Sequence, residues 1–473
     1  MSKEEGRMLF LYGAPASGKT TLGRRLATAG GVAFADLDAE IVRVAGRTIP
    51  EIFATEGEAA FRDLESRTLR QIGAVGVVAL GGGTLLREEN RRFCERKGTV
   101  LCLDTPPEAE LARRMDAAAG TRPLGNRAEE RAAHYASFRN RVSAWFDLGN
   151  SLVLCGRHLA SAFLATRPVV ADATVASLWA DELGLAPIAT VPSGERHKTI
   201  ETVASLWRAF AHAGLGRNDT VVALGGGVTG DLTGFAAATW MRGIDWINVP
   251  TTLLSMVDAS TGGKTGCDLP EGKNLAGAFH APKLVVIDDD FLKTLSPELL
   301  RDGKAEMIKH SIISAGTGPA SAGASPGEAP EKIPSADEIA RNLAVKVGIV
   351  REDPFERRGR RLLLNCGHTV AHAIEKATRY AVSHGSAVAI GCVEEARIAV
   401  RRGLSPADWP DALAARFAVE GLPTALPEGL TLPALVPLMK GDKKRAGSVV
   451  TFALPCGWGD VRAVPIDLAK EAL

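Results

Sequence analysis

Residues 13–20 read GAPASGKT, directly after the apolar run MLFLY (8–12) and directly before the helical pattern TLGRRLA (21–27). This arrangement fits G-x-x-x-x-G-K-[ST] between a strand and a helix, which is the context of a phosphate-binding loop. Backbone N–H groups at the start of the helix would hold phosphates, Lys19 would reach the β and γ phosphates, and Thr20 would bind Mg²⁺. The sequence therefore predicts a site for ATP with Mg²⁺ built from Gly13, Gly18, Lys19 and Thr20.

The alternation of short apolar runs and helical patterns continues over residues 8–150 and is typical of a parallel sheet covered by helices. A second series starts at RPVVAD (167–172) and ends at KLVVID (283–288), after which the periodicity is mainly helical. The Gly, Pro, Ala and Ser-rich stretch 315–337 predicts a flexible loop. We therefore expect an α/β chain with a P-loop domain at 1–155, an α/β nucleotide-binding half at 156–295, and an all-α metal- and substrate-binding half at 296–473.

The overall composition argues against several classes of partner. The 473 residues carry a formal net charge of +1 with no long block of like charge, so the chain lacks the basic footprint of a nucleic-acid-binding protein. The seven cysteines form no C-x-x-C pair, which argues against a disulfide framework and a thiolate zinc site. The apolar run near the N-terminus is too short for a signal sequence or a membrane span. We expect a soluble cytoplasmic protein that acts on small molecules and not on nucleic acid or membranes.

Four further segments follow the phosphate loop: FADLDAEI (34–41), GEAAFRDLES (57–66), LGGG (80–83) and TRPL (121–124). Together with the loop they resemble the shikimate kinase family over residues 7–150. The resemblance implies a P-loop kinase that transfers a phosphoryl group from ATP to shikimate, a reaction catalysed mostly by positioning and charge neutralisation.

The same resemblance implies individual roles. Asp36 would support Mg²⁺, and the catalytic residues would be Lys19, Asp38 and the lid residue Arg122. Shikimate would be held by Asp38, Arg62, Gly81, Gly82, Gly83 and Arg141. The sequence departs from the family at the last of these, because RVSAW starts at Arg141 where the family usually has R-x-P-L-Y.

Four oxygen and nitrogen donors in the last part of the chain suit zinc: Glu306 of AEMIKH, His368 and His372 of GHTVAHA, and His384 of SHG. A catalytic zinc takes three protein ligands and keeps one position open, so one donor is surplus. His368 and His372 are four residues apart on an expected helix and share one face, so spacing alone makes them a chelating pair. The residues by themselves leave open which three bind the metal.

The glycine-rich stretch GGGVTGDLTGFAAA (225–238) follows the strand-like TVVAL and by itself indicates only that a polyphosphate approaches a glycine turn. Other stretches accompany it: VPTTLLSMVDASTGGKTGCDLPEGKN (249–274), AEMIKH (305–310), LLLNCGHTVAHAIE (362–375) and SHGSAVAIG (383–391). They resemble 3-dehydroquinate synthase from about residue 167 to 455, and also the wider group of sugar-phosphate cyclases. The resemblance implies Zn²⁺ or Co²⁺ at Glu306, His368 and His384, with His372 as a substrate and proton-relay residue.

The resemblance further implies bound NAD and a doubly anionic substrate, 3-deoxy-arabino-heptulosonate 7-phosphate, which needs a cationic pocket. The implied NAD contacts are Asp172, Glu195, Lys198, Gly226, Gly227, Asp231, Thr251, Thr252 and Thr294. The implied substrate contacts are Lys264, Lys273, Asn274, Lys309, Lys346, Arg361, Asn365, His372, Lys443 and Lys444, and the implied catalytic residues are Asp258, Lys264 and His372. Arg242 would reach the site of a neighbouring subunit, which implies a homodimer through this part of the chain.

In the implied reaction, NAD⁺ takes a hydride at C5, phosphate leaves, the hydride returns, and an intramolecular aldol closure gives 3-dehydroquinate. We interpret the chain as a bifunctional enzyme, a shikimate kinase followed by a 3-dehydroquinate synthase. Two alternatives stay open. The second unit is another sugar-phosphate cyclase that acts on sedoheptulose 7-phosphate, or one half is a non-catalytic regulatory module.

Overall fold

The computed structural model describes residues 8–73, 76–104, 131–165, 167–314, 332–439, 445–446 and 448–471. The predicted site residues Arg122, Lys443 and Lys444 lie outside these ranges, as does most of the predicted loop 315–337. The chain divides into two compact units. The first comprises Met1–Arg167, Leu183–Leu185 and Pro282–Asp288, and the second comprises Pro168–Glu182, Ala186–Ala281 and Asp289–Leu473. Among the described helices, none has the length and apolar character needed to cross a membrane.

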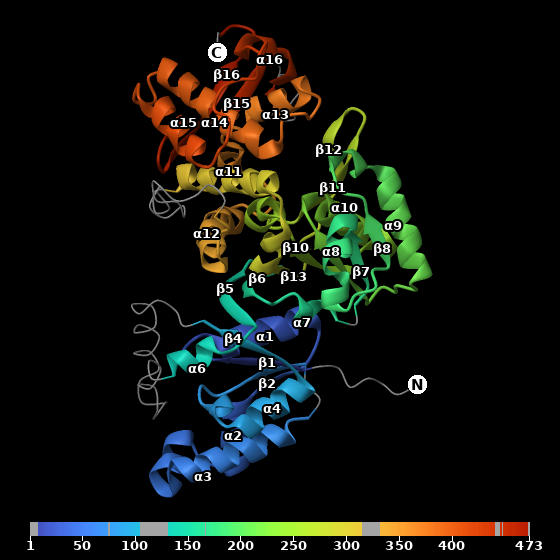
Figure 1. Cartoon of the computed structure of the whole chain (residues 1–473), viewed down its shortest axis with the longest axis vertical. Coiled ribbons are helices and arrows are strands. Elements are labelled where there is room, and N and C mark those ends of the chain that lie inside the picture. The colour runs from blue at the N-terminus through green and yellow to red at the C-terminus, as the bar shows by residue number, and fades with distance from the viewer. Residues whose placement is uncertain are drawn as a thin grey trace. The chain divides into compact units, whose positions relative to one another are not determined.

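The first unit contains a sheet with the strand order β2-β3-β1-β4-β5-β6-β13, parallel except for the β5–β6 pair. Its strands are β1 (Met8–Gly13), β2 (Phe34–Asp36), β3 (Val77–Ala79), β4 (Gly98–Leu103), β5 (Arg141–Asp147), β6 (Leu152–Arg157) and β13 (Leu284–Asp288). Its helices, shown in blue to teal in Figure 1, are α1 (Lys19–Gly30), α2 (Leu37–Ala45), α3 (Ile49–Gln71), α4 (Glu88–Lys97), α6 (Ala132–Ala136) and α7 (Ser161–Leu164). The expected boundary at residue 155 falls inside β6, which pairs with both β5 and β13 and therefore stays in this unit.

The phosphate loop joins β1 to α1, as the sequence predicts. The strand MLFLYG is buried almost throughout, as expected for a parallel strand covered on both faces. Gly18 precedes the helix with φ of 96°, a left-handed conformation that favours glycine. A Cβ on Gly13 would lie 2.6 Å from the carbonyl oxygen of Leu103, so a side chain there would collide with β4. Two glycines therefore let the loop turn tightly at the end of the strand.

The α/β part of the second unit has a parallel sheet in the order β10-β9-β7-β8. Its strands are β7 (Val169–Asp172), β8 (Ala189–Val191), β9 (Thr220–Gly225) and β10 (Asp245–Pro250), and an antiparallel hairpin follows with β11 (Lys264–Leu269) and β12 (Gly272–Phe279). Its helices are α8 (Ala173–Leu183), α9 (Ile200–His212) and α10 (Gly227–Thr239), with short turns η3 (Glu195–His197), η4 (Trp240–Arg242), η5 (Ser255–Ala259) and η6 (Asp289–Thr294). The predicted parallel series is confirmed for these four strands, but its last expected member, KLVVID (283–288), forms β13, which pairs with β6 in the first unit.

The rest of the second unit is mainly helical, but the expectation that it is all-α is wrong. Its helices are α11 (Pro297–Ile313), α12 (Ala336–Glu352), α13 (His368–Ala377), α14 (His384–Arg401), α15 (Trp409–Val419) and α16 (Leu432–Met439), with a short turn η8 (Arg360–Asn365). An antiparallel sheet of β14 (Arg445–Ala446), β15 (Val449–Gly457) and β16 (Asp460–Asp467) follows them. The β-branched run Val449–Thr451 and a left-handed Gly459 with φ of 76° favour this hairpin.

Helix α12 also includes the last two residues of the predicted loop 315–337. Ser335 caps the helix, because its Oγ accepts from the backbone N–H of Glu338 at 3.4 Å. The carboxylate of Glu338 accepts in return from the backbone N–H of Ser335 at 2.8 Å. This capping box satisfies two backbone donors at the helix start, so Ala336 and Asp337 are helical.

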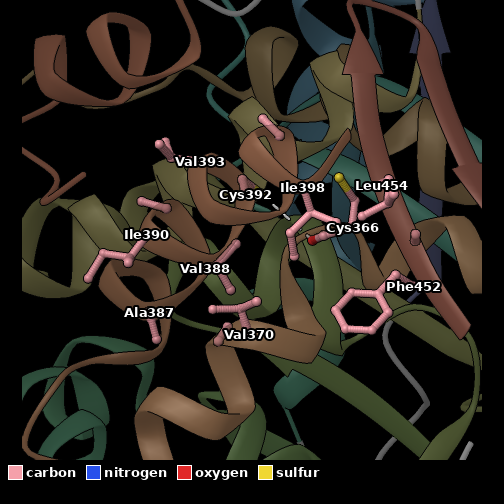
Figure 2. Close-up of a cluster of buried hydrophobic side chains, with 14 of the residues drawn as sticks. Cys366, Val370, Ala387, Val388, Ile390, Cys392, Val393, Ile398, Phe452 and Leu454 are labelled. Carbon is pink, nitrogen blue, oxygen red and sulfur yellow. Dashed lines mark hydrogen bonds between the residues drawn. The ribbon is translucent and has the colours of Figure 1, made fainter. Parts of the chain in front are cut away.

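Strand β15 packs on α13 and α14 in a hydrophobic cluster. Figure 2 shows Phe452 and Leu454 of β15 in one cluster with Val370 of α13 and Val388 of α14. All four side chains are fully buried, and each such burial contributes about 1.5–3 kcal/mol to stability. The cluster therefore holds the two helices whose first residues are His368 and His384.

Candidate active sites

The phosphate loop brings its two predicted magnesium ligands together. Thr20 Oγ1 donates a hydrogen bond to Asp36 Oδ2 at 2.7 Å. These oxygens suit Mg²⁺, which binds one or two protein oxygens together with nucleotide phosphates. Lys19 is buried, and its Nζ donates to the carbonyl oxygens of Gly13 at 2.9 Å and Ala14 at 2.7 Å. The loop therefore holds a cation and a pair of metal-binding oxygens at the N-terminus of α1.

The glycine turn 81–83 contacts predicted acceptor-binding residues from two helices. A Cβ on Gly81 would lie 3.0 Å from Oδ1 of Asp38, and a Cβ on Gly83 would lie 2.5 Å from Nη2 of Arg62. Asp38 lies in the first turn of α2 and Arg62 lies in α3. Glycine is needed because a larger residue would displace either side chain. The structure thus brings three separate segments of the predicted acceptor site together.

Glu65 belongs to this cluster, although the sequence analysis gave it no role. It is buried, its Oε2 lies 2.8 Å from Nη1 of Arg62, and its Oε1 accepts from Thr84 Oγ1 at 2.7 Å. A buried carboxylate with two partners orients the guanidinium of Arg62. The spacing of three residues between Arg62 and Glu65 on one helix is the signal that could have identified it.

For the shikimate-binding arginine that was predicted at Arg141, the structure favours Arg131 instead. Arg141 lies on β5 and is paired with Asp104, because its Nε donates to Oδ1 of that residue at 2.7 Å. Arg131 is 7% exposed and interacts with the side chain of Tyr135, whose hydroxyl donates to the carbonyl oxygen of Gly82 at 2.7 Å. Burial raises the pKa of Tyr135, and Arg131 opposes this shift. Arg131 and Tyr135 have the spacing R-x-x-x-Y of the family pattern R-x-P-L-Y, which is the sequence signal that points to Arg131.

Three of the four candidate metal donors meet in the second unit. Glu306 of α11 has its Oε1 3.1 Å from Nε2 of His384 and 3.5 Å from Nε2 of His368. One ligand atom from each of the three lies within 4.8 Å of the others, and no described group of this kind includes His372. The ring of His372 lies one helical turn from that of His368, with 5.4 Å between the centroids. The tertiary structure thus supports the ligand set implied by the resemblance over the pair favoured by spacing.

A second group of possible donors overlaps with the first. It consists of Asp258, Glu306 and His310. Two of its members already have other partners, since Lys346 Nζ donates to Asp258 Oδ1 at 2.6 Å and His310 Nδ1 lies 2.8 Å from Asn342 Oδ1. A cation at this group would compete with the ammonium of Lys346. The group with two histidines is therefore the better metal site.

Burial and neighbouring charges set the protonation of the metal donors. Burial by itself would raise the pKa of Glu306, but the ammonium of Lys309 and a hydrogen bond from His384 hold that pKa well below its usual range. Burial, assisted by Lys309, lowers the pKa of His368 to about 3, so its imidazole is neutral. Its Nδ1 lies 3.1 Å from the carbonyl oxygen of Cys366, which places the proton on Nδ1. Nε2 therefore presents a lone pair to the metal position.

Glu375, which the sequence analysis did not assign, orients His384. Its Oε1 lies 3.2 Å from Nδ1 of His384, on the opposite side of the ring from Glu306. Although burial opposes it, hydrogen bonds to Glu306 and Glu375 raise the pKa of His384 to about 10. A divalent cation at Nε2 would replace one proton, while Glu375 would keep the other on Nδ1. The set of one carboxylate and two oriented imidazoles fits zinc.

Buried cations surround the predicted catalytic residue Asp258. Burial would raise its pKa, but Lys346 and Lys309 hold that pKa well below the usual range. Arg361 is 4% exposed, and its Nη1 donates to the carbonyl oxygen of Gly262 at 3.2 Å. Lys309 also forms an ion pair with Glu306, so these three cationic side chains face the two carboxylates of Asp258 and Glu306. A concentration of buried cations suits an anionic substrate.

Lys273 connects the metal-binding part to the predicted NAD-binding part. Its Nζ lies 3.7 Å from Oε1 of Glu375 and 3.4 Å from Oε1 of Glu195. Lys264 is exposed and forms an ion pair with Glu356. The sequence had predicted both lysines as substrate contacts, and Lys273 is the one that lies beside a partner of a metal ligand.

The predicted NAD contacts gather at the carboxyl ends of neighbouring parallel strands, where dinucleotides bind in such sheets. Lys198 is buried, and its Nζ lies 2.6 Å from Asp231 Oδ2 and 2.6 Å from Asn274 Oδ1. It joins the glycine-rich helix α10 to the β11–β12 hairpin. The residues at the strand ends and the following turns are Asp172, Gly226, Gly227, Thr251 and Thr252. Thr294, another predicted NAD contact, accepts a hydrogen bond from Trp179 Nε1 at 3.0 Å. Of the predicted substrate contacts, Asn365 donates to the carbonyl oxygen of Leu362 at 3.2 Å and Arg242 is exposed in η4.

Three family models match the chain. Residues 15–160 match the shikimate kinase model. Residues 188–302 match the model of the 3-dehydroquinate synthase N-terminal part, and residues 303–445 match that of its C-terminal part. The last match contains all three clustered metal donors.

Curated relatives match the second unit. The 3-dehydroquinate synthase of Synechococcus sp. is 46% identical over 292 residues, which cover 60% of this chain and 79% of that protein. The 3-dehydroquinate synthase of Symbiobacterium thermophilum is 40% identical over 316 residues, which cover 64% of this chain and 88% of that protein. The similarity therefore extends over most of the length of each relative.

Two solved structures are similar to the same part of the chain. The 2-epi-5-epi-valiolone synthase from Streptomyces hygroscopicus subsp. jinggangensis, solved with NAD⁺ and Zn²⁺, is 27% identical with a TM-score of 0.56 and covers 68% of this chain and 94% of that chain. A 2-deoxy-scyllo-inosose synthase is 24% identical with a TM-score of 0.59, covers 69% of this chain and 97% of that chain, and shows the same fold. The chain therefore belongs to the 3-dehydroquinate synthase family and carries a shikimate kinase domain at its N-terminal end.

Proposed function

We propose that the chain is a bifunctional enzyme of aromatic-precursor synthesis. The first unit phosphorylates shikimate to shikimate 3-phosphate with ATP and Mg²⁺. The second unit converts 3-deoxy-arabino-heptulosonate 7-phosphate to 3-dehydroquinate and phosphate with NAD and a divalent metal, Zn²⁺ or Co²⁺. The single observation that supports the second activity best is the cluster of Glu306, His368 and His384, whose ligand atoms lie within 4.8 Å of one another beside buried cations.

In the kinase unit, the residues act mainly by position and charge. Lys19 would neutralise the phosphates of ATP, and Thr20 and Asp36 would hold Mg²⁺. Asp38 lies at the glycine turn, where it can accept the proton of the attacked hydroxyl. Arg62, oriented by Glu65, provides a fixed cation for the carboxylate of shikimate.

Replacing Arg131 with methionine is expected to raise the KM for shikimate by about 10- to 100-fold, because a charge-assisted contact contributes about 1.5–3 kcal/mol. The matched variant Arg141→Met should leave that KM within about twofold, since Arg141 is paired with Asp104. A coupled assay of ADP release against shikimate concentration measures the KM for shikimate of both variants. A larger KM effect from Arg141→Met than from Arg131→Met would restore the original assignment.

In the synthase unit, the bound metal and NAD would supply Lewis acidity and a reversible hydride acceptor. The chain itself binds and orients the substrate. Lys309, Lys346 and Arg361 provide a fixed positive field for its anionic ends. His372, one turn beyond His368 on α13, would relay a proton at the substrate.

The identity of the heptulose substrate is tested directly by comparing two phosphates. We expect phosphate release and 3-dehydroquinate formation with 3-deoxy-arabino-heptulosonate 7-phosphate. Sedoheptulose 7-phosphate lacks the carboxylate, so it should react at least about 100-fold more slowly because buried cations would stay unpaired. Phosphate release measures the turnover of each of the two heptulose phosphates, and the mass of the product identifies the reaction. Turnover of sedoheptulose 7-phosphate alone would instead assign the second unit to the other cyclases.

We also propose a cytoplasmic homodimer that forms through the second unit. Arg242 is exposed and follows α10 in a strained turn, where its φ is 71°. Its side chain is therefore accessible to a second copy of the chain. A residue from a second copy that completes the site would make activity depend on protein concentration. Sedimentation velocity combined with activity measured on dilution would test this assembly.

A further inference from the structure

Helices α13 and α14 meet backbone to backbone at two glycines. A Cβ on Gly391 of α14 would lie 2.1 Å from the carbonyl oxygen of Gly367. A Cβ on Gly367 would lie 2.4 Å from Sγ of Cys392 and 2.8 Å from its backbone nitrogen. Gly367 also has φ of 77°, which favours glycine independently of the contact. The residue before α13 therefore has to be glycine.

This requirement leaves the start of α13 without a capping side chain of its own. Helices usually begin with a Ser, Thr, Asp or Asn whose side chain accepts hydrogen bonds from the first backbone N–H groups. Gly367 occupies that position in α13 and makes no side-chain cap. His368, a predicted metal ligand, is the first residue of the helix. Its backbone geometry therefore depends on an acceptor from elsewhere.

Glu395 of α14 supplies this acceptor. Its Oε2 accepts from the backbone N–H of Gly367 at 2.8 Å, and its Oε1 accepts from the backbone N–H of Val370 at 3.2 Å. These are the donors that a capping box would satisfy, on either side of His368. The partial positive charge at a helix N-terminus further stabilises the carboxylate.

The position of Glu395 is costly unless these hydrogen bonds are made. The side chain is fully buried, and the neighbouring Ala396 and Val393 belong to the hydrophobic cluster in which Figure 2 shows Val393. A buried carboxylate is expensive to desolvate, so an apolar residue would serve packing alone better. The bonds to Gly367 and Val370 explain why a carboxylate occupies a site in this core.

We propose that Glu395 is a positioning residue that fixes the metal-binding geometry before the metal binds. Helix α14 begins with the ligand His384 and, three turns later, uses Glu395 to hold the segment that carries the ligand His368. One helix thus sets the relative position of both imidazoles. This inference rests on the proposed metal-dependent function of the same site.

The test is the metal affinity of Glu395→Gln in the full-length protein. The amide can accept one hydrogen bond but places its NH₂ group against a backbone N–H, so one of the two hydrogen bonds between this side chain and the start of α13 is lost. We expect zinc affinity, measured by competition with a chromophoric chelator, to fall by about 10- to 100-fold. The visible spectrum of the Co²⁺ form should also change, because the coordination geometry relaxes. NAD affinity, measured by calorimetry, should stay within about twofold.

Glu394→Gln is the matched control. Glu394 is a buried glutamate on the same helix, and it forms an ion pair with Arg397 of α14 itself. Its zinc affinity should equal that of the unaltered protein. If Glu395→Gln does not fold, Glu395→Asp keeps the charge but shortens the reach by one methylene, and it should also weaken zinc binding.

The outcomes separate this inference from the proposed function. Equal zinc affinities in the Glu395 and Glu394 variants would overturn the positioning role while leaving the metal site intact. A parallel loss of NAD and zinc affinity in Glu395→Gln and Glu395→Asp would show a general structural role and would overturn it as well. Absence of stoichiometric metal binding in the unaltered protein would instead contradict the proposed function itself.

Discussion

Replacing His368 or His384 with alanine is expected to remove the metal from the second unit and to lower 3-dehydroquinate formation by about 10³-fold or more, because Lewis-acid stabilisation of several kcal/mol is lost. His384→Ala also leaves Glu306 and Glu375 without the imidazole that lies 3.1 Å from one and 3.2 Å from the other. Removal of one of three ligands leaves too few donors to retain zinc.

His372→Ala is the matched comparison for these two variants. It removes an imidazole from the same helix face as His368, yet His372 is outside the metal cluster of the described residues. We expect it to retain one metal per chain and to lower turnover through loss of a proton relay, by about 10²- to 10⁴-fold. Elemental analysis of the three purified variants measures metal content, and phosphate release measures turnover. Equal metal loss in all three variants would contradict the ligand assignment.

The second large effect is expected in the kinase unit, where Lys19→Met should lower shikimate phosphorylation by about 10²- to 10³-fold, as for loss of a preorganised charged donor. The Lys19 ammonium lies against the carbonyl oxygens of Gly13 and Ala14, at the position that the phosphates of ATP would occupy. Methionine has a similar length and no charge, so it tests the ammonium more than the packing. ADP release in the presence of shikimate measures the loss.

The other half of the same protein supplies the control for Lys19→Met. Formation of 3-dehydroquinate should stay unchanged, because the synthase residues belong to a separate compact unit. Conversely, His384→Ala should leave shikimate phosphorylation intact. Unchanged phosphorylation in Lys19→Met would favour a regulatory role for the first unit and would refute the role assigned to this lysine.

Local sequence was sufficient to predict the phosphate loop. All of its determinants lie within one continuous stretch, in which a buried strand, two glycines and a helix start follow one another directly. The role of Asp36 beside Thr20 came from the family resemblance, and the structure brings the two side chains together at the carboxyl-end edge of the parallel sheet. The parallel series in the second unit was predictable for the same reason, since its buried strands are uninterrupted apolar runs.

Residues that act through another segment were harder to predict. Arg131 is connected to the glycine turn through Tyr135, whose hydroxyl donates to the carbonyl oxygen of Gly82, 53 residues away in the sequence. Glu65 lies close to Arg62 on α3, but its second partner, Thr84, is 19 residues away. The β15–β16 hairpin was missed because the helical periodicity of the preceding residues was extended beyond its end. Each of these features depends on long-range packing, which composition and periodicity do not encode locally.

The metal site shows most clearly which features follow from the sequence and which follow from the tertiary structure. The sequence by itself determined the four possible donors and, through helix geometry, the common face of His368 and His372. Residue spacing favoured His372 as the third ligand and the family resemblance implied His384, and the tertiary structure places His384 beside Glu306. The reason is that the second imidazole comes from the start of another helix, and the position of that helix is determined by close glycine contacts and a buried carboxylate instead of residue spacing.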